Sequence, residues 1–412
     1  MTDEATARAF YLDLLGFTID FAFRISDDAP LYLQITRGDC TIQLSGHHAD
    51  AVPGGALRIE ADDLDALYQE LLDRKPEQAG LNVRDTPWRT REMTIVDPSG
   101  NRLIFWQPTM ARRVDVSFDV GDLRGDMTPV GLTAQWVAAN RALETESPDP
   151  LYRDPFAREL AGPAGFAMMM ATRAVLGLTD ATRPEPYLTI RTKYLDDSLI
   201  AAVKESGFTQ VVILAAGMDA RAFRLEWPAG VKVFEVDRDD IFQYKEATLA
   251  RLGAKASCDR RLVRADLSQP WTQQLVDAGF DVNQPAAFLT EGLLMYLDEA
   301  SVTRLFNAIR TLAAPGSWIA MDITNTDMLT SNYTAAYMKK LAEAGCPWLF
   351  GVDDPGALLA QHGWQATVAS PGDAVASYGR WPHAPMPRSV PGMPRTFFVT
   401  ARRMPEQPGR LT

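Results

Sequence analysis

A glycine and several acids stand at spacings that suit the binding of a nucleoside. Each acid comes at or just after the end of a short apolar run: Asp219, Asp237, Asp266 with its neighbour Leu267, and Glu291. Gly217 follows the first run, 209–215, and Asp237 comes twenty residues later. If the runs are parallel strands, their ends meet at one edge of a sheet, where doubly wound folds bind ligands. A glycine there lets the backbone approach the ligand, and an acid placed like Asp237 can accept hydrogen bonds from ribose hydroxyls.

The turn after the first run reads AAGMDAR, and this distinguishes two classes of nucleoside. A dinucleotide site needs three glycines and a helix N-terminus that is free to receive pyrophosphate. This turn has one glycine, and we predict that Asp219 lies in the first turn of a helix over 218–225. A carboxylate there repels pyrophosphate but attracts the ammonium of a methionine group. The turn therefore favours S-adenosylmethionine over NAD.

The elements that must position these residues form an alternating pattern after residue 128. Buried strands are predicted over 209–215, 231–236, 286–290 and 317–323, and a late strand, which could be antiparallel at the end of the sheet, over 395–402. Helices are predicted over 186–206, 239–252 and 299–312. This alternation is typical of the α/β class, with helices covering both faces of a parallel sheet.

Residues 1–108 follow a different pattern. Helices are predicted over 5–15 and 62–74, and strands over 31–36, 41–44, 56–61, 92–96 and 102–107. This order suggests two related α+β halves. The stretch 109–127 mixes charge, glycine and proline, as linkers do. We therefore predict a small domain over 1–108, a linker over 109–127 and a large domain over 128–412.

Composition narrows the classes of function. A chain of 412 residues suits two domains, and a formal net charge of −12 argues against a broad phosphate-binding surface, so we expect no nucleic-acid partner. The three cysteines lie far apart with no metal-binding spacing, which is typical of reduced thiols in a cytoplasmic protein. No signal segment precedes the first helix, and no apolar run approaches the roughly 18 residues that cross a membrane.

Several ordered motifs of the large domain resemble one family. They read VILAAGMDARAFRL (212–225), FEVD (234–237), ADL (265–267) and EGLLMYL (291–297), with TAQWVAANRALE (133–144), LYRDPFA (151–157) and RTKYLDD (191–197) before them. Over 128–402 the chain resembles the leucine carboxyl methyltransferase family, and within it the bacterial O-methyltransferase branch. The resemblance implies a class I methyltransferase fold with a Rossmann-like sheet and S-adenosylmethionine as methyl donor.

The resemblance also implies roles for matching residues. In the family, the arginine matching Arg191 holds the donor carboxylate, and the glycine matching Gly217 approaches the methionine part. Asp237 matches the acid that binds the ribose of the donor. Asp266 and Leu267 match the pair of residues beside the adenine, and Glu291 matches an acid that lines the donor pocket. One residue departs from the pattern: Ala215 stands where the family usually has glycine. Alanine is tolerable there if its φ is negative.

The methyl acceptor is less defined. The resemblance implies an oxygen acceptor, either a carboxylate, which needs no base, or a hydroxyl, which needs one. Candidate bases are His362, His383 and Tyr296, and candidate anchors for a carboxylate are Arg221, Arg380 and Arg388. No single catalytic residue is assigned. The segment 325–351, rich in aromatic residues and methionine, and the N-terminal helices of the large domain are expected to cover the site of a mostly apolar small molecule.

In the small domain, AFYLDLLGF (9–17), IEADDLDAL (59–67) and DPSGNRLIF (97–105) resemble the glyoxalase/bleomycin-resistance family, with its vicinal oxygen chelate fold. Metal-dependent members bind through histidine and glutamate, but Ala56 and Ile104 hold two of those positions here, and neither can ligate a metal. Adjacent His47 and His48 on a strand would point to opposite faces. We expect a non-catalytic, metal-free module that binds a small molecule, shapes the acceptor pocket or forms a homodimer.

Two functions remain in competition. The first is an O-methyltransferase that acts on a carboxylate or hydroxyl of a small molecule, such as a secondary metabolite. The alternative is a small-molecule binding or resistance protein that uses the N-terminal domain and carries a degenerate methyltransferase domain; Ala215 favours it. A dehydrogenase is disfavoured by Asp219 and the missing glycines, and transfer-RNA modification fits the acidic charge poorly.

Overall fold

The structure is a computed structural model of the whole chain. It describes residues 3–24, 26, 29–46, 54–74, 82–86, 90–108, 128–175, 183–331, 334–382, 388 and 392–405. The chain divides into two compact units, Met1–Val116 and Ser117–Thr412. The predicted linker over 109–127 lies outside the described residues, as do His47, His48 and His383.

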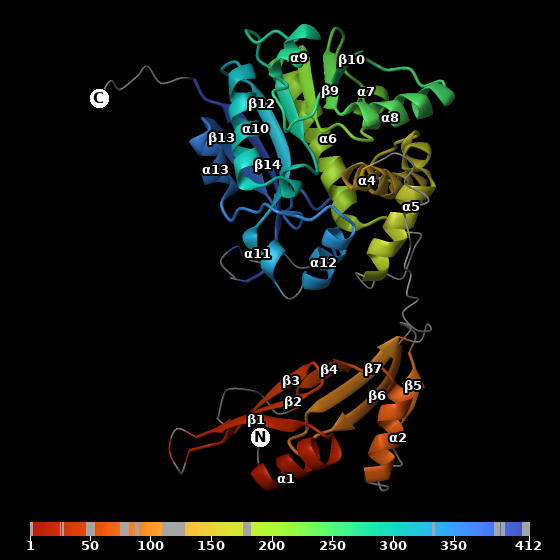
Figure 1. Cartoon of the computed structure of the whole chain (residues 1–412), viewed down its shortest axis with the longest axis vertical. Helices are drawn as coiled ribbons and strands as arrows, with labels where there is room; N and C mark the ends of the chain where they lie inside the picture. Colours follow the sequence, from red (N-terminus) through yellow and green to blue (C-terminus); the bar gives the residue numbers. More distant parts are fainter. Residues whose placement is uncertain are drawn as a thin grey trace, which may run out of the picture. The chain divides into compact units, whose positions relative to one another are not determined.

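The larger unit is built on one seven-stranded sheet (Figure 1). Its strands are β8 (Gln210–Leu214), β9 (Lys232–Asp237), β10 (Asp259–Arg264), β11 (Ala287–Thr290), β12 (Trp318–Thr324), β13 (Trp364–Ala369) and β14 (Thr396–Arg403). Their order is β10-β9-β8-β11-β12-β14-β13. The first five pair in parallel, whereas β14 is antiparallel to both neighbours. The carboxyl ends of five parallel strands therefore meet at one edge.

Helices cover both faces of this sheet. They are α4 (Pro129–Glu146), α5 (Ala157–Val175), α6 (Pro186–Ser206), α7 (Arg221–Arg224), α8 (Asp239–Arg251), α9 (Thr272–Asp277), α10 (Glu299–Leu312), α11 (Thr326–Thr330), α12 (Ala335–Glu343) and α13 (Pro355–Gln361), with a 3₁₀ turn, η3, at Leu294–Tyr296. Alternate residues of β8 face opposite cores: Val212 and Leu214 pack with α10, while Val211 and Ile213 pack with α6. The predicted α/β class with a doubly wound sheet is confirmed.

Helix α6 shows how local sequence sets an element that borders the site. The carboxylate of Glu185 accepts hydrogen bonds from the backbone N–H groups of Tyr187 and Leu188, and Pro186 occupies the first turn. Gly207 ends the helix in the left-handed conformation, at φ 64°. The predicted bounds, 186–206, are those of the structure.

Two predictions for the larger unit are wrong. The helix expected over 218–225 is the single turn α7, so Asp219 lies before the helix and not in its first turn. The late strand, β14, is antiparallel but lies inside the sheet, because β13 pairs beyond it. The sequence did not predict β13, whose middle residues are half-buried or exposed and lack a continuous apolar run.

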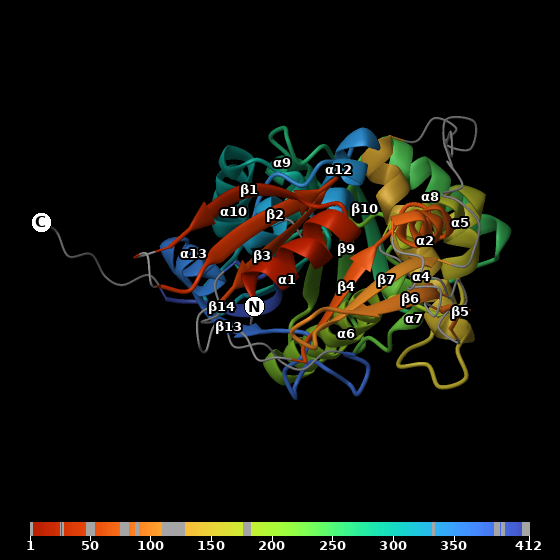
Figure 2. The ribbon, with the colours of Figure 1, turned by 90° about the horizontal axis from the view of Figure 1, so that it is seen from below.

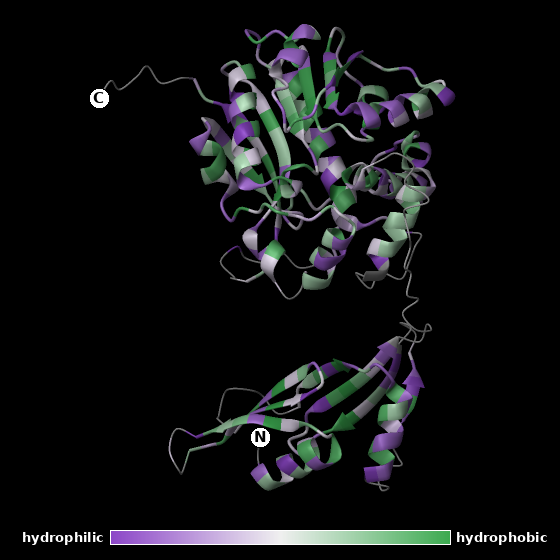
Figure 3. Cartoon of the chain, in the orientation of Figure 1, coloured by the Kyte–Doolittle hydropathy of each residue, from purple (hydrophilic) through white to green (hydrophobic). Residues whose placement is uncertain are grey.

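The smaller unit contains two sheets (Figure 2). Its elements are α1 (Glu4–Arg8), which continues as a π-helix over Ala9–Leu14, then β1 (Thr18–Phe23), β2 (Tyr32–Arg37), β3 (Cys40–Ser45), β4 (Ala56–Glu60), α2 (Leu64–Arg74), β5 (Val83–Asp85), β6 (Thr90–Val96) and β7 (Arg102–Pro108). The sheets have the orders β1-β2-β3 and β4-β7-β6-β5. Both sheets contribute apolar residues to one core shared with the helices. Hydrophobic residues recur along these strands and helices (Figure 3). Strands β1 and β5 were not predicted, because their residues are mostly exposed and do not alternate clearly.

Candidate functional site

One cavity of about 440 Å³ lies at the carboxyl ends of the parallel strands. Its lining includes all seven residues predicted for the donor site: Arg191, Gly217, Asp219, Asp237, Asp266, Leu267 and Glu291. They come from α6 and from the segments that end or follow β8, β9, β10 and β11. A volume in this range suits a small-molecule ligand. The structure therefore brings together side chains that lie up to a hundred residues apart in the sequence.

The turn after β8 is fastened to the end of β9. The N–H of Gly217 donates to Asp237 Oδ2 at 2.6 Å, and the N–H of Arg238 donates to Asp237 Oδ1 at 2.7 Å. Gly217 has φ 45°, and a Cβ there would lie 2.9 Å from Ala134 Cβ on α4. Glycine is therefore required both by the backbone conformation and by the close approach of a helix. Burial raises the pKa of Asp237 above its ordinary value, and these two N–H groups oppose that rise.

Ala215, in the same turn, also has positive φ, at 52°. The condition under which alanine would be tolerated at this position, a negative φ, is therefore not met. A left-handed conformation brings the Cβ of an L-residue close to its own carbonyl oxygen and costs roughly 1–2 kcal/mol. The turn thus holds local strain at the point where the family usually has glycine.

Asp219 was predicted in the first turn of a helix, but it precedes the helix and is paired with an arginine. Its carboxylate accepts from the N–H of Arg221 at 2.6 Å and forms an ion pair with the Arg221 guanidinium. Burial opposes ionisation, but the charges of Arg221, Lys245 and Arg224 lower the pKa of Asp219 to about 2. Asp219 therefore lines the cavity as a fixed anion that already has a cationic partner.

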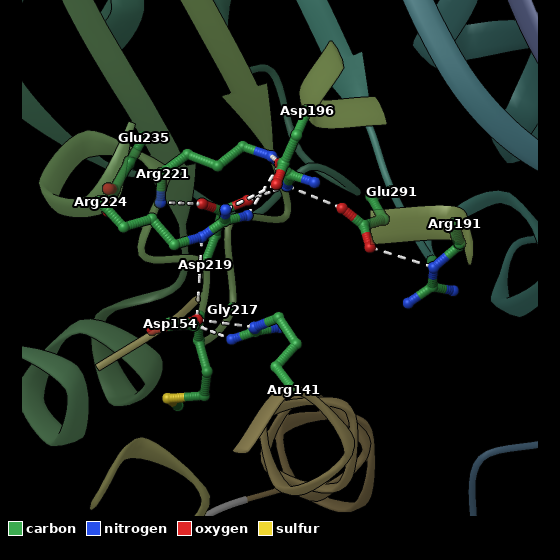
Figure 4. Close-up of polar contacts among 12 residues, drawn as sticks. Arg141, Asp154, Arg191, Asp196, Gly217, Asp219, Arg221, Arg224, Glu235 and Glu291 are labelled. Carbon is green, nitrogen blue, oxygen red and sulfur yellow. Dashed lines mark hydrogen bonds and ion pairs between the residues drawn. The ribbon is translucent and has the colours of Figure 1, made fainter. Parts of the chain in front are cut away.

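Arg191 and Glu291 form the cavity end of a buried chain of alternating charges (Figure 4). Arg191 Nε lies 3.0 Å from Glu291 Oε1, and Arg191 Nη1 lies 3.1 Å from Asp322 Oδ2. The hydroxyl of Tyr187 donates to the same Asp322 oxygen at 2.9 Å. Arg221 Nη1 lies 2.7 Å from the second oxygen of Glu291. Burial opposes ionisation of Glu291, but Arg221 and Arg191 keep its pKa below the ordinary value.

The chain of charges continues from Arg221 through Asp196 and Arg224 (Figure 4). Arg221 Nε lies 2.7 Å from Asp196, and Arg224 Nη1 lies 2.5 Å from the other oxygen of Asp196. Asp154 then pairs with Arg141 at 2.9 Å. These side chains are nearly all withdrawn from solvent, so each charge depends on its neighbours for compensation.

Sequence reasoning missed Asp322, which is fully buried in β12. Besides pairing with Arg191, its carboxylate accepts from the N–H of Gly292 at 2.6 Å. The signal was present: Asp322 is the one acid in the run WIAMDIT, whose other residues are apolar or threonine. A lone carboxylate within a buried strand needs a partner, and this indicates a polar site.

Asp266 and Leu267 follow β10 and contribute to the lining. Asp266 is exposed and accepts from the N–H of Ser268 at 2.8 Å. Leu267 is half-buried and packs against the core. Together they offer one polar and one apolar surface to the cavity.

A second part of the lining is aromatic. Tyr296 and Tyr337 both meet Trp348 edge to face, with ring centroids 6.4 and 5.6 Å apart. The predicted covering segment, 325–351, supplies Tyr337 and Trp348 together with Met328, and α4 supplies Trp136. The lining therefore contains several carboxylates, here called the acid-rich part, and a group of contacting aromatic rings, here called the aromatic part.

Of the six candidate acceptor residues, Tyr296 is the one that the structure places in this lining. His362 stacks on Phe306, with ring centroids 5.1 Å apart, and Arg221 lies within the charge chain. Arg380 contacts Asp149, and Arg388 donates to a backbone carbonyl. None of these four side chains lines the cavity, so none of them serves there as a base or anchor for the acceptor.

In the smaller unit, Ala56 begins β4 and Ile104 lies in the middle of the neighbouring strand β7. Among the residues that the structure describes, no group of three histidine, cysteine, aspartate or glutamate side chains is placed to hold a metal ion.

The acid-rich part of the cavity fits S-adenosylmethionine. The donor carries two positive centres, a sulfonium and an ammonium, and the lining offers Asp219, Asp237 and Glu291 close to the turn that requires glycine. Asp237 uses its oxygens for two backbone N–H groups, and a carboxylate has about four acceptor sites, so it can still accept from ribose hydroxyls.

Comparisons with known proteins agree with this fit. Residues 134–310 match the family model described as leucine carboxyl methyltransferase, and residues 1–111 match a glyoxalase superfamily model. A relative in Mycolicibacterium smegmatis is 39% identical over 272 residues, covering 63% of this chain and 91% of the relative. One in Rhodococcus jostii is 39% identical over 295 residues, covering 68% and 98%. Both carry the name "Putative S-adenosyl-L-methionine-dependent methyltransferase".

Among solved structures, a DUF574 family protein of Streptomyces avermitilis superposes with a TM-score of 0.43 at 15% identity, covering 63% of this chain and 99% of that one. The family match, the two relatives and the seven residues gathered in one cavity agree on identity. The chain belongs to the leucine carboxyl methyltransferase family of S-adenosylmethionine-dependent methyltransferases and carries an N-terminal unit of the glyoxalase superfamily.

Proposed function

We propose that this methyltransferase transfers a methyl group to a carboxylate or hydroxyl oxygen of a small molecule. The observation that carries the proposal is one cavity that is lined both by carboxylates and by a group of aromatic rings. When bound, S-adenosylmethionine supplies an electrophilic methyl group on a sulfonium. The protein's task is then to hold that methyl group and an oxygen nucleophile in line.

The acid-rich part would hold the donor. Asp237 accepts hydrogen bonds from the ribose hydroxyls, and Asp266 and Leu267 flank the adenine. Gly217 lets the backbone approach the methionine part, Asp219 and Glu291 attract its ammonium, and Arg191 holds its carboxylate. Arg191 has five N–H donors, of which its two recorded carboxylate contacts use two, so donors remain for this role.

The aromatic part would hold the acceptor. Tyr296, Tyr337 and Trp348 supply large apolar surfaces with polar tips, which suit a small molecule with an apolar body and an oxygen function. Two of these three side chains come from the covering segment, so that segment would contribute to acceptor choice.

Isothermal titration of the wild-type protein with S-adenosylmethionine tests the donor assignment. Asp237→Asn should weaken binding about tenfold or more, because a hydrogen bond to a charged group contributes roughly 1.5–3 kcal/mol. Asp239→Asn is the matched control: this acid begins α8 two residues away, is exposed, and does not line the cavity. Absence of donor binding to the wild type would refute the proposal.

The acceptor would be sought with labelled methyl donor. Purified protein, donor and a metabolite extract of the host are incubated, and mass spectrometry identifies newly labelled species. A labelled small molecule supports the proposal, whereas label confined to protein or nucleic acid contradicts it. We expect no nucleic-acid partner, given the net charge of −12. In the described part of the chain, no helix is long and apolar enough to span a membrane.

For the N-terminal unit we propose a non-catalytic role in homodimer formation. Phe21 and Phe23 on β1 are 46% and 56% exposed, and Phe21 stacks on Tyr32 of β2. Exposed aromatic residues gathered on one strand are typical of interaction surfaces.

A further inference from the structure

The cations that line the cavity are already paired with carboxylates. Among the lining residues that the structure describes, the basic side chains are Arg141, Arg191 and Arg238. Arg141 pairs with Asp154 at 2.9 Å, and Arg238 pairs with Asp240 at 2.6 Å. Arg191 pairs with two carboxylates, those of Glu291 and Asp322. Arg191 is also assigned to the donor carboxylate, so an additional carboxylate from the acceptor would have to compete with existing carboxylate partners for every cation of the lining.

Acids outnumber bases in the same lining. The carboxylates are Glu185, Asp219, Asp237, Asp266 and Glu291, against three arginines. Asp219 and Glu291 are held by arginines, Asp237 is held by the Gly217 turn, and Asp266 is exposed beyond β10. This leaves Glu185 as the lining carboxylate that has neither an arginine partner among the recorded ion pairs nor a proposed role toward the donor.

The carboxylate of Glu185 is fixed by two hydrogen bonds and still has acceptor sites that could receive a proton. One carboxylate oxygen accepts from the N–H of Tyr187 at 3.1 Å and the other from the N–H of Leu188 at 2.9 Å. About two of its four acceptor sites are therefore unused. These two bonds fix the carboxylate at the N-terminus of α6 while it lines the cavity.

The charged and titratable groups around Glu185 come from three helices. Arg191 and Tyr187 face it from α6, Arg173 from α5, and Tyr337 from the covering helix α12. Burial raises the pKa of Glu185, and the backbone N–H groups and the two arginines oppose that rise. Burial also raises the pKa of Tyr296 and of Tyr337, which disfavours the phenolate forms that would act as bases.

From these contacts we infer that the acceptor is a neutral molecule methylated on a hydroxyl group, and that Glu185 accepts the hydroxyl proton. The inference rests on the proposed O-methyltransferase function. The hydroxyl O–H bond breaks and its proton moves to the Glu185 carboxylate. An oxygen lone pair forms the new O–C bond, while the S–C bond of the donor breaks and its electron pair stays on sulfur.

The chemistry of the labelled product tests the acceptor class. Products made from labelled donor and host extract are treated with mild alkali, which hydrolyses methyl esters to methanol but leaves methyl ethers intact. We expect the label to remain on the product. Release of labelled methanol would overturn the inference while leaving the proposed methyltransferase function in place. Absence of any labelled product would instead contradict the proposed function.

The variant Glu185→Gln tests the proton acceptor, because glutamine keeps one oxygen for the helix cap. We expect kcat to fall about 100-fold or more, the usual contribution of a general base. Donor affinity by calorimetry should change less than twofold. In the wild type, kcat should rise with pH through the raised pKa of Glu185, and this acidic limb should vanish in the variant.

Two further variants separate chemistry from helix capping. Asp298→Asn alters the N-cap of α10, where Asp298 accepts from the N–H of Ser301 outside the cavity, and should leave kcat and its pH profile unchanged. Glu185→Asp keeps a carboxylate and should recover part of the rate. A Glu185→Gln protein with wild-type kcat and an unchanged acidic limb would overturn the role of Glu185.

Discussion

Ala215 shows how a single residue can hold strain in a binding turn. It adopts φ 52° between β8 and Gly217, where most L-residues are disfavoured. The conformation persists because the neighbouring backbone is fixed on both sides: β8 is buried in the sheet, and the N–H of Ala216 bonds the carbonyl of Val236. The surrounding structure therefore over-determines the turn, as is usual for strain at functional sites.

Ala215→Gly should stabilise the larger unit. Glycine accepts positive φ without steric cost, so we expect a gain of about 1 kcal/mol and a rise in melting temperature of about 2 °C. Donor affinity should stay unchanged or increase. Thermal unfolding and calorimetric titration measure the two effects.

Ala216→Gly is the matched control for this prediction. Ala216 is buried and does not have positive φ, so glycine there should destabilise the protein by roughly 0.5–1 kcal/mol. A marked loss of donor affinity in Ala215→Gly would mean that the turn is organised differently from the structure described above.

The sequence predicts which residues belong to the site better than it predicts their backbone conformation and their ion pairs. Acids at the ends of strands could be recognised, because apolar runs that stop at a carboxylate mark the rim of a parallel sheet. The φ of Ala215 and the pairing of Asp219 with Arg221 could not, because both depend on how neighbouring segments fold onto the turn.

At the scale of elements, the strands β8, β9, β11, β12 and β14 and the helices α6, α8 and α10 were predicted within one or two residues of their bounds. Helices α6 and α10 each have an N-cap residue directly before the predicted start, Glu185 and Asp298 respectively. Strands β1, β5 and β13 were missed because each lies at an edge of its sheet and alternates poorly between apolar and polar residues. An edge strand is paired on one side only and can leave most of its residues exposed, so its sequence carries a weaker apolar pattern.

The buried charge chain couples three segments that are far apart in the sequence: β12, α6 and the turn after β11. Asp322 in β12 binds Arg191 of α6, the N–H of Gly292 after β11, and Tyr187 at the start of α6. Removing one partner of a buried ion pair leaves an uncompensated charge in a medium of low dielectric constant. We therefore expect the loss of one charge to disturb its neighbours in the charge chain, including Arg191 and Glu291 at the donor cavity.

Asp322→Asn should therefore weaken both stability and donor binding, although Asp322 does not line the cavity. Asparagine keeps an oxygen for the N–H of Gly292, but Arg191 loses one of its two charge partners, so we expect a loss of about 3 kcal/mol in the free energy of unfolding. Urea unfolding and calorimetric titration measure the changes. Asp327→Asn, on the exposed helix α11 five residues later, is the control and should alter neither quantity strongly; equal effects in both variants would contradict the proposed coupling.

At the scale of the whole molecule, each unit has its own apolar core, and the donor cavity is lined by residues of the larger unit. Binding of the donor and self-association through β1 should accordingly respond to separate mutations. A change on the surface of the smaller unit is expected to leave the donor site intact.

The double variant Phe21→Ser, Phe23→Ser should shift the protein from dimer to monomer, because it removes the exposed aromatic surface of β1. Light scattering coupled to size-exclusion chromatography measures the mass, and calorimetry should show unchanged donor affinity. Val375→Ser, at a still more exposed apolar residue of the larger unit, is the control. A wild-type protein that is monomeric at all concentrations would exclude this interface.

The cavity draws its lining from Thr128 to Thr396, nearly the whole length of the larger unit. An unfolded chain has no such cavity, so every bound donor molecule withdraws protein from the unfolding equilibrium. By mass action, donor at a hundred times its dissociation constant should add about 2.7 kcal/mol to the free energy of unfolding. The melting temperature then serves as a gauge of donor occupancy, and the lifetime of the folded enzyme becomes tied to the supply of the methyl donor around it.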